Sequence, residues 1–363
     1  MHTKDVHKMK RYGNLYPNIY DMDNLILAHQ NAKKGKGWYQ EVKMVESDPE
    51  YYLGKLQQML IDKTYRTSQY ETFIKKDSGK EREIFKLPYF PDRICQWAIM
   101  QIIEPILLNN FTTDTYSAIP GRGIHLCLNK LNHALQHDVP ESQYCLKLDA
   151  KKFYPSINHD ILKRKYRRLF KDPDLLWLID EIIDSTPGGT GIPIGNYLSQ
   201  YSGNFYFSEF DHWIKEVKRV KYYFRYMDDI VILGRSKEEL HELKKEIDEY
   251  FRSKLKLKIK ENWQVFPTYV RGIDFVGYRT FMNYKLLRKT TCKQFKRKMV
   301  AIHRKKIEDQ ELTYSEWCSI NSYKGWLIHC NSYRLKEKYI DPIQGFADKY
   351  YLENIYKKGG VLT

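Results

Sequence analysis

The sequence predicts an α+β fold in which helices pack on one face of an antiparallel sheet. Patterns of two short strands around a turn recur, as in FIKKDSGKEREIF and KYYFRYMDDIVILGR. Segments with apolar residues at helical spacing separate them, as in RICQWAIMQIIEPILL. The elements do not form a repeating strand–helix–strand series, which would have favoured a parallel sheet.

Composition indicates a folded protein with a polyanionic partner. The chain has 363 residues, of which 42% are hydrophobic, and its formal net charge is +16. Cations spread along the whole chain suit a nucleic acid, because neutralised phosphates release counterions. The 30 tyrosines, 16 phenylalanines and 7 tryptophans suit stacking on unpaired bases, although most are expected in the core.

Cysteine usage and hydropathy indicate a cytoplasmic protein without a membrane span. The six cysteines form no CxxC pair and no zinc pattern, so we expect six free, buried thiols. No run approaches the roughly 18 apolar residues of a membrane helix. The first residues, MHTKDVHKMKRYGN, have no apolar core of signal-peptide length.

The first third of the chain is predicted to be helical around one hairpin. Residues 24–64 have a helical pattern, in which Leu53, Leu56, Leu60 and Ile61 fall at helical spacing. Two strands around a Ser-Gly turn follow, then a strong helix after Pro91. AIPGRGIH is a loop, and a helix runs from it to about residue 137.

The remainder alternates strands, hairpins and helices. YCLKLDAKKFYPSI begins as a strand and breaks at Pro155, and HDILKRKYRRLF and DLLWLIDEIID are helical. The glycine-rich loop TPGGTGIPIGN precedes a long helix, YLSQYSGNFYFSEFDHWIKEV. After the KYYFRYMDDIVILGR hairpin, Ser236 and Glu239 form a capping box for the next helix. GIDFVGYRTF and NYKLLRK form another hairpin, and the chain from about residue 290 is helical and basic.

Three carboxylates occupy positions that solvent alone does not explain. Asp149 ends the strand LKLD, and Asp228 and Asp229 lie at a hairpin tip between apolar residues. A bare Asp-Asp pair is most often a solvated turn, but the usual turn residues Gly, Pro, Asn and Ser are absent between Phe224 and Leu233. Converging carboxylates repel one another unless a cation lies between them. Magnesium takes oxygen ligands and needs only one or two protein carboxylates, which suits phosphoryl transfer.

These residues lie within motifs that resemble those of reverse transcriptases. YMDD at 226–229 and LKLDAKKFYPSI at 146–157 are similar to motifs C and A. The flanking motifs resemble the group II intron-like bacterial branch and occur in its order: GKEREIFKLPYFPDRICQWAI, TYSAIPGRGIH, GIPIGNYLSQ (motif B) and GIDFVGYRTF.

The resemblance implies a right-hand polymerase fold and an RNA-directed DNA polymerase activity. It divides the chain into an N-terminal helical extension (1–65), fingers and palm with an antiparallel sheet and packed helices (66–285), and a helical thumb (286–363). The expected partners are an RNA template, an RNA–DNA duplex and dNTPs. The expected cofactor is two Mg²⁺ ions, with Mn²⁺ able to substitute.

Motif B narrows the resemblance further. Ile194-Gly195 followed by Ser199-Gln200 is most similar to reverse transcriptases of diversity-generating retroelements, which are error-prone. That class implies two further partners, a structured template RNA and a small, basic, oligomeric accessory protein. Two alternatives stay open: an antiphage defence reverse transcriptase, and a noncatalytic, maturase-like RNA-binding protein.

The metal-site residues carry over by motif position. The resemblance assigns Asp149 and Asp228 as the principal magnesium ligands, Asp229 as the third catalytic carboxylate, and the carbonyl of Ala150 as a further ligand. Tyr154 corresponds to the aromatic that excludes a ribose 2′-hydroxyl, although it could equally be a core aromatic.

Other residues are assigned to nucleotide and template binding. Lys80 and Arg82 correspond to contacts with the triphosphate, with solvated surface cations as the alternative. Gly195 and Gln200 are expected to line the nucleotide pocket, and Gln200 could instead be an ordinary helix residue. Arg122 is expected at the template or nucleotide, and Ile194 and Gln200 are the fidelity positions.

The last third of the chain leaves alternatives open for the general acid and for the role of its basic helices. Simple alignment puts Asn262 or Trp263 where many relatives carry a lysine that protonates the leaving pyrophosphate, with Lys260 near but offset, so the general acid stays open. KQFKRKM, HRKK and YRLKEKY suggest a basic helical face that grips an A-form-like duplex by its phosphates. A solvated helix surface explains about half of those cations equally well.

Overall fold

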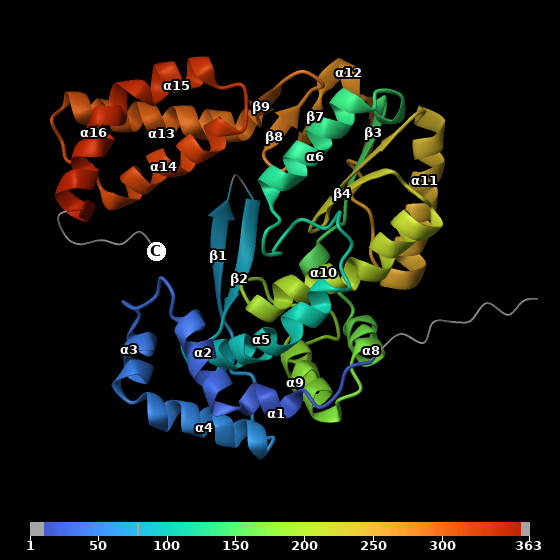
Figure 1. Ribbon diagram of the computed structural model, residues 1–363, viewed down its shortest axis with the longest axis vertical. Helices are drawn as coiled ribbons and strands as arrows, with labels where there is room; N and C mark the ends of the chain where they lie inside the picture. Colours follow the sequence, from blue (N-terminus) through green and yellow to red (C-terminus); the bar gives the residue numbers. More distant parts are fainter. Residues whose placement is uncertain (1–10, 78–79, 357–363) are drawn as a thin grey trace, which may run out of the picture. The chain divides into compact units, whose positions relative to one another are not determined.

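The computed structural model describes residues 11–77 and 80–356. In that part of the chain, helices alternate with three separate sheets of two, four and three strands (Figure 1). The predicted α+β class is confirmed.

The chain forms two compact units. Among the described residues, one contains 11–121, Leu148–Ile230 and Glu242–Trp263, and the other contains Arg122–Lys147, Val231–His241 and 264–356. The division into segments 1–65, 66–285 and 286–363 stays a prediction.

The first unit begins with capped helices: α1 (Tyr16–Tyr20), α2 (Met22–Ala32), α3 (Gln40–Ser47) and α4 (Pro49–Ile61). Asp21 accepts hydrogen bonds from the backbone at the start of α2, and Asp48 does the same for α4. Of the four apolar positions predicted to share the α4 face, Leu53, Leu56 and Leu60 are buried, but Ile61 is 47% exposed. Its place beside Leu60, rather than three or four residues from Leu56, turns it outward.

The predicted fingers hairpin and the helix after it are both present. Strands β1 (Glu71–Asp77) and β2 (Lys80–Lys86) pair antiparallel, with Glu71 opposite Lys86. Residues 78–79, the predicted Ser-Gly turn, lie outside the described residues. Helix α5 (Ile94–Leu108) is apolar around most of its surface and packs against α2 and α10.

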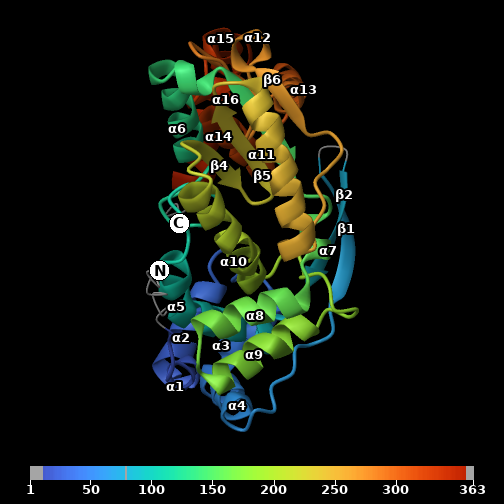
Figure 2. The same cartoon turned by 90° about the vertical axis from the view of Figure 1, so that its right-hand side faces the viewer.

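Helix α10 (Tyr197–His212) is the central helix of the first unit, since most of its residues on every side are buried. Helix α8 (His159–Leu169) packs on both α10 and α9 (Pro173–Asp184), as Figure 2 shows. Asn158 caps α8 and Asp172 caps α9 through their side chains.

The four-stranded sheet carries the motif A and motif C segments. Its hydrogen-bonded order is β4 (Tyr222–Tyr226), β5 (Asp229–Gly234), β3 (Tyr144–Asp149) and β6 (Gln264–Pro267). Strand β6 pairs antiparallel with β3, with Phe266 opposite Cys145, and was not predicted from the sequence. After β3 the chain makes a one-turn helix, α7 (Phe153–Ser156), which contains Pro155 and replaces the predicted simple break.

The second unit contains a three-stranded sheet and a run of helices. The predicted pairing of GIDFVGYRTF with NYKLLRK is present between β8 (Tyr278–Thr280) and β9 (Lys285–Leu287), but the first segment also folds back on itself at Val276-Gly277 and adds a third strand, β7 (Ile273–Phe275). The helical elements that lie in it wholly or in part are α6 (Ile124–His137), α11 (Lys237–Tyr250), α12 (Thr268–Arg271), α13 (Lys289–Ile307), α14 (Tyr314–Ile328), α15 (Tyr333–Tyr339) and α16 (Asp341–Tyr351). Short helical turns in the first unit are η1 (Tyr89–Arg93), η3 (Trp213–Val217) and η4 (Phe251–Leu255), and those in the second are η2 (Pro140–Ser142) and η5 (Leu352–Tyr356).

The prediction of six free, buried thiols is only partly correct. All six cysteines are free, as predicted, but only Cys95, Cys127 and Cys145 are buried, and the other three are partly exposed. Within residues 11–77 and 80–356, no helix is both long enough and apolar enough to cross a bilayer.

A glycine between β7 and β8 tests the packing of the second unit. Gly277 has φ +87°, and a Cβ there would overlap the Trp326 ring. We expect Gly277→Ala to lower the free energy of unfolding by roughly 2–4 kcal/mol, from backbone strain and overpacking. Gly345→Ala, in α16 with no neighbouring atom within 4 Å, is the control and should raise it by about 0.5–1 kcal/mol. Urea titrations measure both, and an equal effect of the two substitutions would contradict this packing.

Candidate active site

The site begins where β3 ends and where β4 turns into β5. Asp149 is the last residue of β3, and Met227 and Asp228 form the turn of the hairpin. The apolar run Ile230–Leu233 is buried, so β5 anchors the turn. Met227 adopts φ +54°, a left-handed conformation that costs a side-chain-bearing residue about 1–2 kcal/mol. The turn is therefore held by its surroundings rather than by its own preference.

Lys260 lies between the two carboxylates. Its Nζ is 2.5 Å from Asp149 Oδ2 and 3.9 Å from Asp228 Oδ2, and each of the three side chains is about one-third exposed. The Lys260 backbone N–H donates to the Asp149 carbonyl at 2.8 Å, and Ile259 forms a bridge with Ala150. An extended segment thus runs beside the end of β3 and directs the ammonium to the acids.

The alignment that pointed to Asn262 or Trp263 missed this contact. The structure places Lys260 beside the carboxylates, two or three residues earlier. The alternation of Lys258 and Lys260 was the available signal, since every second residue of an extended segment points to the same side.

The carboxylates perturb one another strongly. Burial, followed by the neighbouring Asp149 carboxylate, raises the pKa of Asp228 to about 7, while the charge of Lys260 acts in the opposite direction. Asp228 is thus poised to lose its proton when more positive charge arrives.

The donor set fits a divalent cation with oxygen ligands. Asp149 Oδ1 is buried and has no hydrogen-bond partner in the described structure, although the other oxygen is paired with Lys260. A buried carboxylate oxygen without a donor is costly unless a cation or water satisfies it. One or two protein carboxylates suffice for magnesium.

Asp229, the predicted third ligand, does not form a three-residue metal-binding cluster with Asp149 and Asp228 in the described structure. Among the residues that the structure describes, no three His, Cys, Asp or Glu side chains are grouped closely enough to hold a metal. Asp229 begins β5 and is half-buried, so its role as third ligand stays a prediction. Ala150 is fully buried, and its N–H donates to the Asp228 carbonyl at 3.3 Å.

Tyr154 lies against the hairpin turn from α7. Its hydroxyl is 3.7 Å from Met227 Sδ, and the side chain is half-buried. Burial and then the charge of Asp228 raise the pKa of the phenol, so it stays neutral. A rigid, neutral ring next to the carboxylates is compatible with the predicted sugar-excluding role.

Motif B lines a cavity of about 320 Å³, to which it contributes the predicted Gly195 and Gln200 together with Asn196 and Tyr197. The aspartates do not line it. Gly195 has φ +118°, and a Cβ there would lie 3.2 Å from the Phe85 carbonyl. The Phe85 N–H in turn donates to the Ile194 carbonyl at 3.3 Å. The motif B loop therefore packs on β2, and rings and cations complete the cavity wall: Phe85, Trp97, Tyr197, Lys36, Lys86 and Arg93.

The remaining predicted residues are not tested by this geometry. Lys80 and Arg82 lie on β2 opposite Asp77 and Lys75, but their side chains are outside the described part of the structure. Arg122 is half-buried before α6 and belongs to the second compact unit. Their roles stay predictions.

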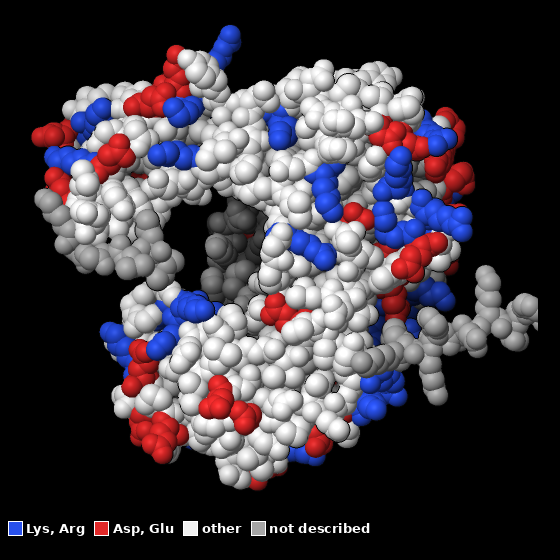
Figure 3. All heavy atoms as spheres, in the orientation of Figure 1, with Lys and Arg blue, Asp and Glu red and all other residues white. Residues whose placement is uncertain are grey.

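The basic helices of the second unit do not form a uniformly positive surface. On the face in Figure 3, Lys and Arg are interspersed with Asp and Glu over α13–α16. Two of the predicted cations are paired locally: Lys305 with Glu316 at 2.9 Å and Lys336 with Asp341 at 2.8 Å. The predicted face that binds duplex phosphates stays a prediction, and the paired cations Lys305 and Lys336 are the least available to it.

Comparison with known proteins places the motifs in a family. Residues 74–280 match the family model described as reverse transcriptase (RNA-dependent DNA polymerase). Protein YkfC of Escherichia coli K12 is 22% identical over 249 residues, covering 57% of this chain and 65% of that protein. The group II intron-encoded protein LtrA of Lactococcus lactis subsp. cremoris is 24% identical over 223 residues, covering 57% and 36% respectively.

This chain thus spans less than two-thirds of the length of each of these curated relatives. Among solved structures, telomerase from Candida tropicalis with a fragment of telomeric RNA matches with a TM-score of 0.44 and 13% identity, covering 63% of this chain and 47% of that one.

The raised pKa of Asp228 makes a stability prediction. Without metal, the charge on Asp228 costs stability above pH 7, and this cost falls to nothing below the unfolded-state pKa near 4. Asp228→Asn should therefore raise the free energy of unfolding by about 2–4 kcal/mol at pH 8 in EDTA, and by little at pH 4. The matched control is Asp309→Asn, at an exposed position. Urea titrations at both pH values test this, and a gain that does not depend on pH would contradict it.

Proposed function

Since this chain belongs to the reverse transcriptase (RNA-dependent DNA polymerase) family, we propose that it is an RNA-directed DNA polymerase that copies an RNA template from dNTPs. The observation that supports this most is the pair of carboxylates, Asp149 and Asp228, that converge on one ammonium from two different motifs. A noncatalytic RNA-binding protein has no need for such a costly pair.

The chemistry divides between the metal and the side chains. The proposed cofactor is two Mg²⁺ ions, with Mn²⁺ as a substitute, which would activate the attacking 3′-hydroxyl and stabilise the leaving pyrophosphate. Asp149 and Asp228 would hold these ions, with Asp229 and the Ala150 carbonyl as further ligands. Lys260 is a candidate proton donor or phosphate contact, because its ammonium lies beside the carboxylates.

Substrate selection is assigned to Tyr154 and motif B. The Tyr154 ring would lie under the sugar and leave no volume for a 2′-hydroxyl. Gly195 would let the backbone approach the base pair, with Gln200 beside it on the same cavity wall. Lys80, Arg82 and Arg122 are proposed to contact the triphosphate and template as cations.

The finer proposal is the error-prone polymerase of a diversity-generating retroelement. Its support is motif B, in which Ile194-Gly195 and Ser199-Gln200 have the form typical of that class. Both fidelity positions are near the cavity wall, since Gln200 lines it and the Ile194 carbonyl is bonded to Phe85. A structured template RNA and a small basic accessory protein are the partners this role would require.

Sequencing cDNA made on a defined RNA template tests activity and fidelity together. We expect full-length cDNA with substitutions concentrated at template adenines, and a loss of at least about 1,000-fold for Asp228→Ala, because the metal ligand is gone. Asp309→Asn is the control and should match the wild type. Normal cDNA from Asp228→Ala would contradict the polymerase assignment. Faithful copying at adenines would contradict the diversity-generating role and favour a defence enzyme.

Tyr154 makes a separate prediction on sugar selection. Tyr154→Val removes the ring and should raise ribonucleotide incorporation relative to dNTP incorporation by roughly 10-fold or more. Tyr154→Phe keeps the ring and should discriminate as the wild type does. Competition between labelled rNTP and dNTP measures both, and unchanged discrimination in Tyr154→Val would make Tyr154 a core aromatic.

A further inference from the structure

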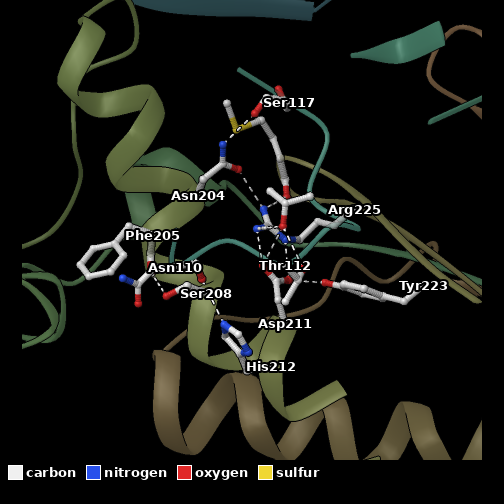
Figure 4. A network of polar contacts seen from close by, with 12 residues as sticks. Asn110, Thr112, Ser117, Asn204, Phe205, Ser208, Asp211, His212, Tyr223 and Arg225 are labelled. Carbon is white, nitrogen blue, oxygen red and sulfur yellow. Dashed lines mark hydrogen bonds and ion pairs between the residues drawn. The ribbon is translucent and has the colours of Figure 1, made fainter. Parts of the chain in front are cut away.

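Arg225 lies on β4, three residues before Asp228, and its side chain is fully buried. Figure 4 shows its guanidinium next to Asp211 of α10. Nε and Nη2 donate to the two oxygens of Asp211 at 2.7 and 2.5 Å, and Asp211 is also fully buried. Tyr223 and Thr115 donate to the same carboxylate at 2.6 and 3.1 Å. The pair is therefore bidentate and saturated, which a buried charge requires.

The other edge of the guanidinium reaches the hairpin turn. Nη1 donates to Asn204 Oδ1 at 3.1 Å and to the Met227 carbonyl at 3.0 Å, while Nη2 also donates to Thr115 Oγ1 at 3.2 Å. All five N–H groups of Arg225 thus have an acceptor, and one acceptor belongs to the turn. Asn204 is itself fixed, since its amide donates to the Ser117 carbonyl at 2.7 Å.

The hydrogen bond from Arg225 to the Met227 carbonyl fixes the backbone next to Asp228. This carbonyl is part of the peptide that joins Met227 to Asp228, and Met227 is the left-handed residue of the turn. On the other side of Asp228, its own carbonyl accepts from the Ala150 N–H at 3.3 Å. The backbone of Asp228 is held from both sides, by α10 through Arg225 and by the end of β3 through Ala150.

We propose that Arg225 is a positioning residue for the metal-binding carboxylates, which sets the direction of Asp228 by holding the Met227 carbonyl and is itself anchored on Asp211. The inference rests on the proposed function only in taking Asp149 and Asp228 as metal ligands. A purely structural buried pair would stabilise the protein equally well, but it would have no particular effect on metal affinity.

Metal affinity is therefore the measurement that separates the two roles. Arg225→Lys keeps the charge but lacks the donor fork, so it cannot serve Asp211 and Met227 together. We expect the folded variant to bind Mn²⁺ about 10-fold more weakly than the wild type by calorimetric titration. Its primer extension should fall at low Mn²⁺ and recover towards the wild-type rate at high Mn²⁺, because the carboxylates remain present.

Two further variants make the result decisive. Tyr223→Phe removes one bond to Asp211 but leaves the bond from Arg225 to Met227, so its thermal stability should fall while its Mn²⁺ affinity stays within about twofold of the wild type. Asp211→Glu keeps both charges and displaces the guanidinium from Met227, so it should also weaken Mn²⁺ binding. If Arg225→Lys does not fold, Asp211→Glu tests the positioning role of Arg225 in its place.

Wild-type Mn²⁺ affinity in Arg225→Lys or Asp211→Glu would overturn the inference, as would an equal loss of affinity in Tyr223→Phe. These titrations do not depend on polymerisation. A wild-type protein that binds Mn²⁺ but makes no cDNA would contradict the proposed function and leave this inference standing.

Discussion

The repulsion between Asp149 and Asp228 is the constraint on which the rest of the site depends. Two carboxylates that approach each other in a half-buried setting are stable only if positive charge lies between them. Lys260 supplies that charge at 2.5 Å from one acid and 3.9 Å from the other. Even so, the pKa of Asp228 is raised to about 7, and one oxygen of Asp149 has no partner in the described structure. The site is therefore arranged for more positive charge than a single ammonium provides, which is the condition for binding a divalent cation.

The surrounding fold holds this unfavourable pair in place. β5 anchors one side of the hairpin through its buried apolar run, while α10 holds the turn through the guanidinium of Arg225. The extended segment at Lys258–Lys260 runs along residues 149–151 and brings the compensating cation. These contacts offset the strain of the left-handed Met227 and the repulsion between the two acids. Without them, both would relax.

Much of this arrangement could be predicted from the sequence, for physical reasons that differ between residues. The strands around Asp149 and Asp228 were predictable because alternating or continuous apolar runs leave little choice of structure. The position of Lys260 was not, because it lies 111 residues from Asp149 and reaches it only by strand pairing. The role of Arg225 was not predicted from the sequence. An arginine between Phe224 and Tyr226 in a buried strand was the available signal, but its partner, Asp211, is defined by tertiary packing alone. Strand β6 was missed because QVFP is short and ends in proline.

We propose that the Asp149–Asp228 pair is a divalent-cation site, at which the Lys260 ammonium takes the place of the ion when none is bound. Anomalous scattering from Mn²⁺ in crystals grown with an RNA–DNA primer-template tests it most directly. We predict a manganese peak coordinated by carboxylate oxygens of both Asp149 and Asp228, with the Lys260 ammonium displaced from Asp149. Manganese bound only elsewhere, with the Lys260–Asp149 ion pair intact in the presence of the primer-template, would contradict the account.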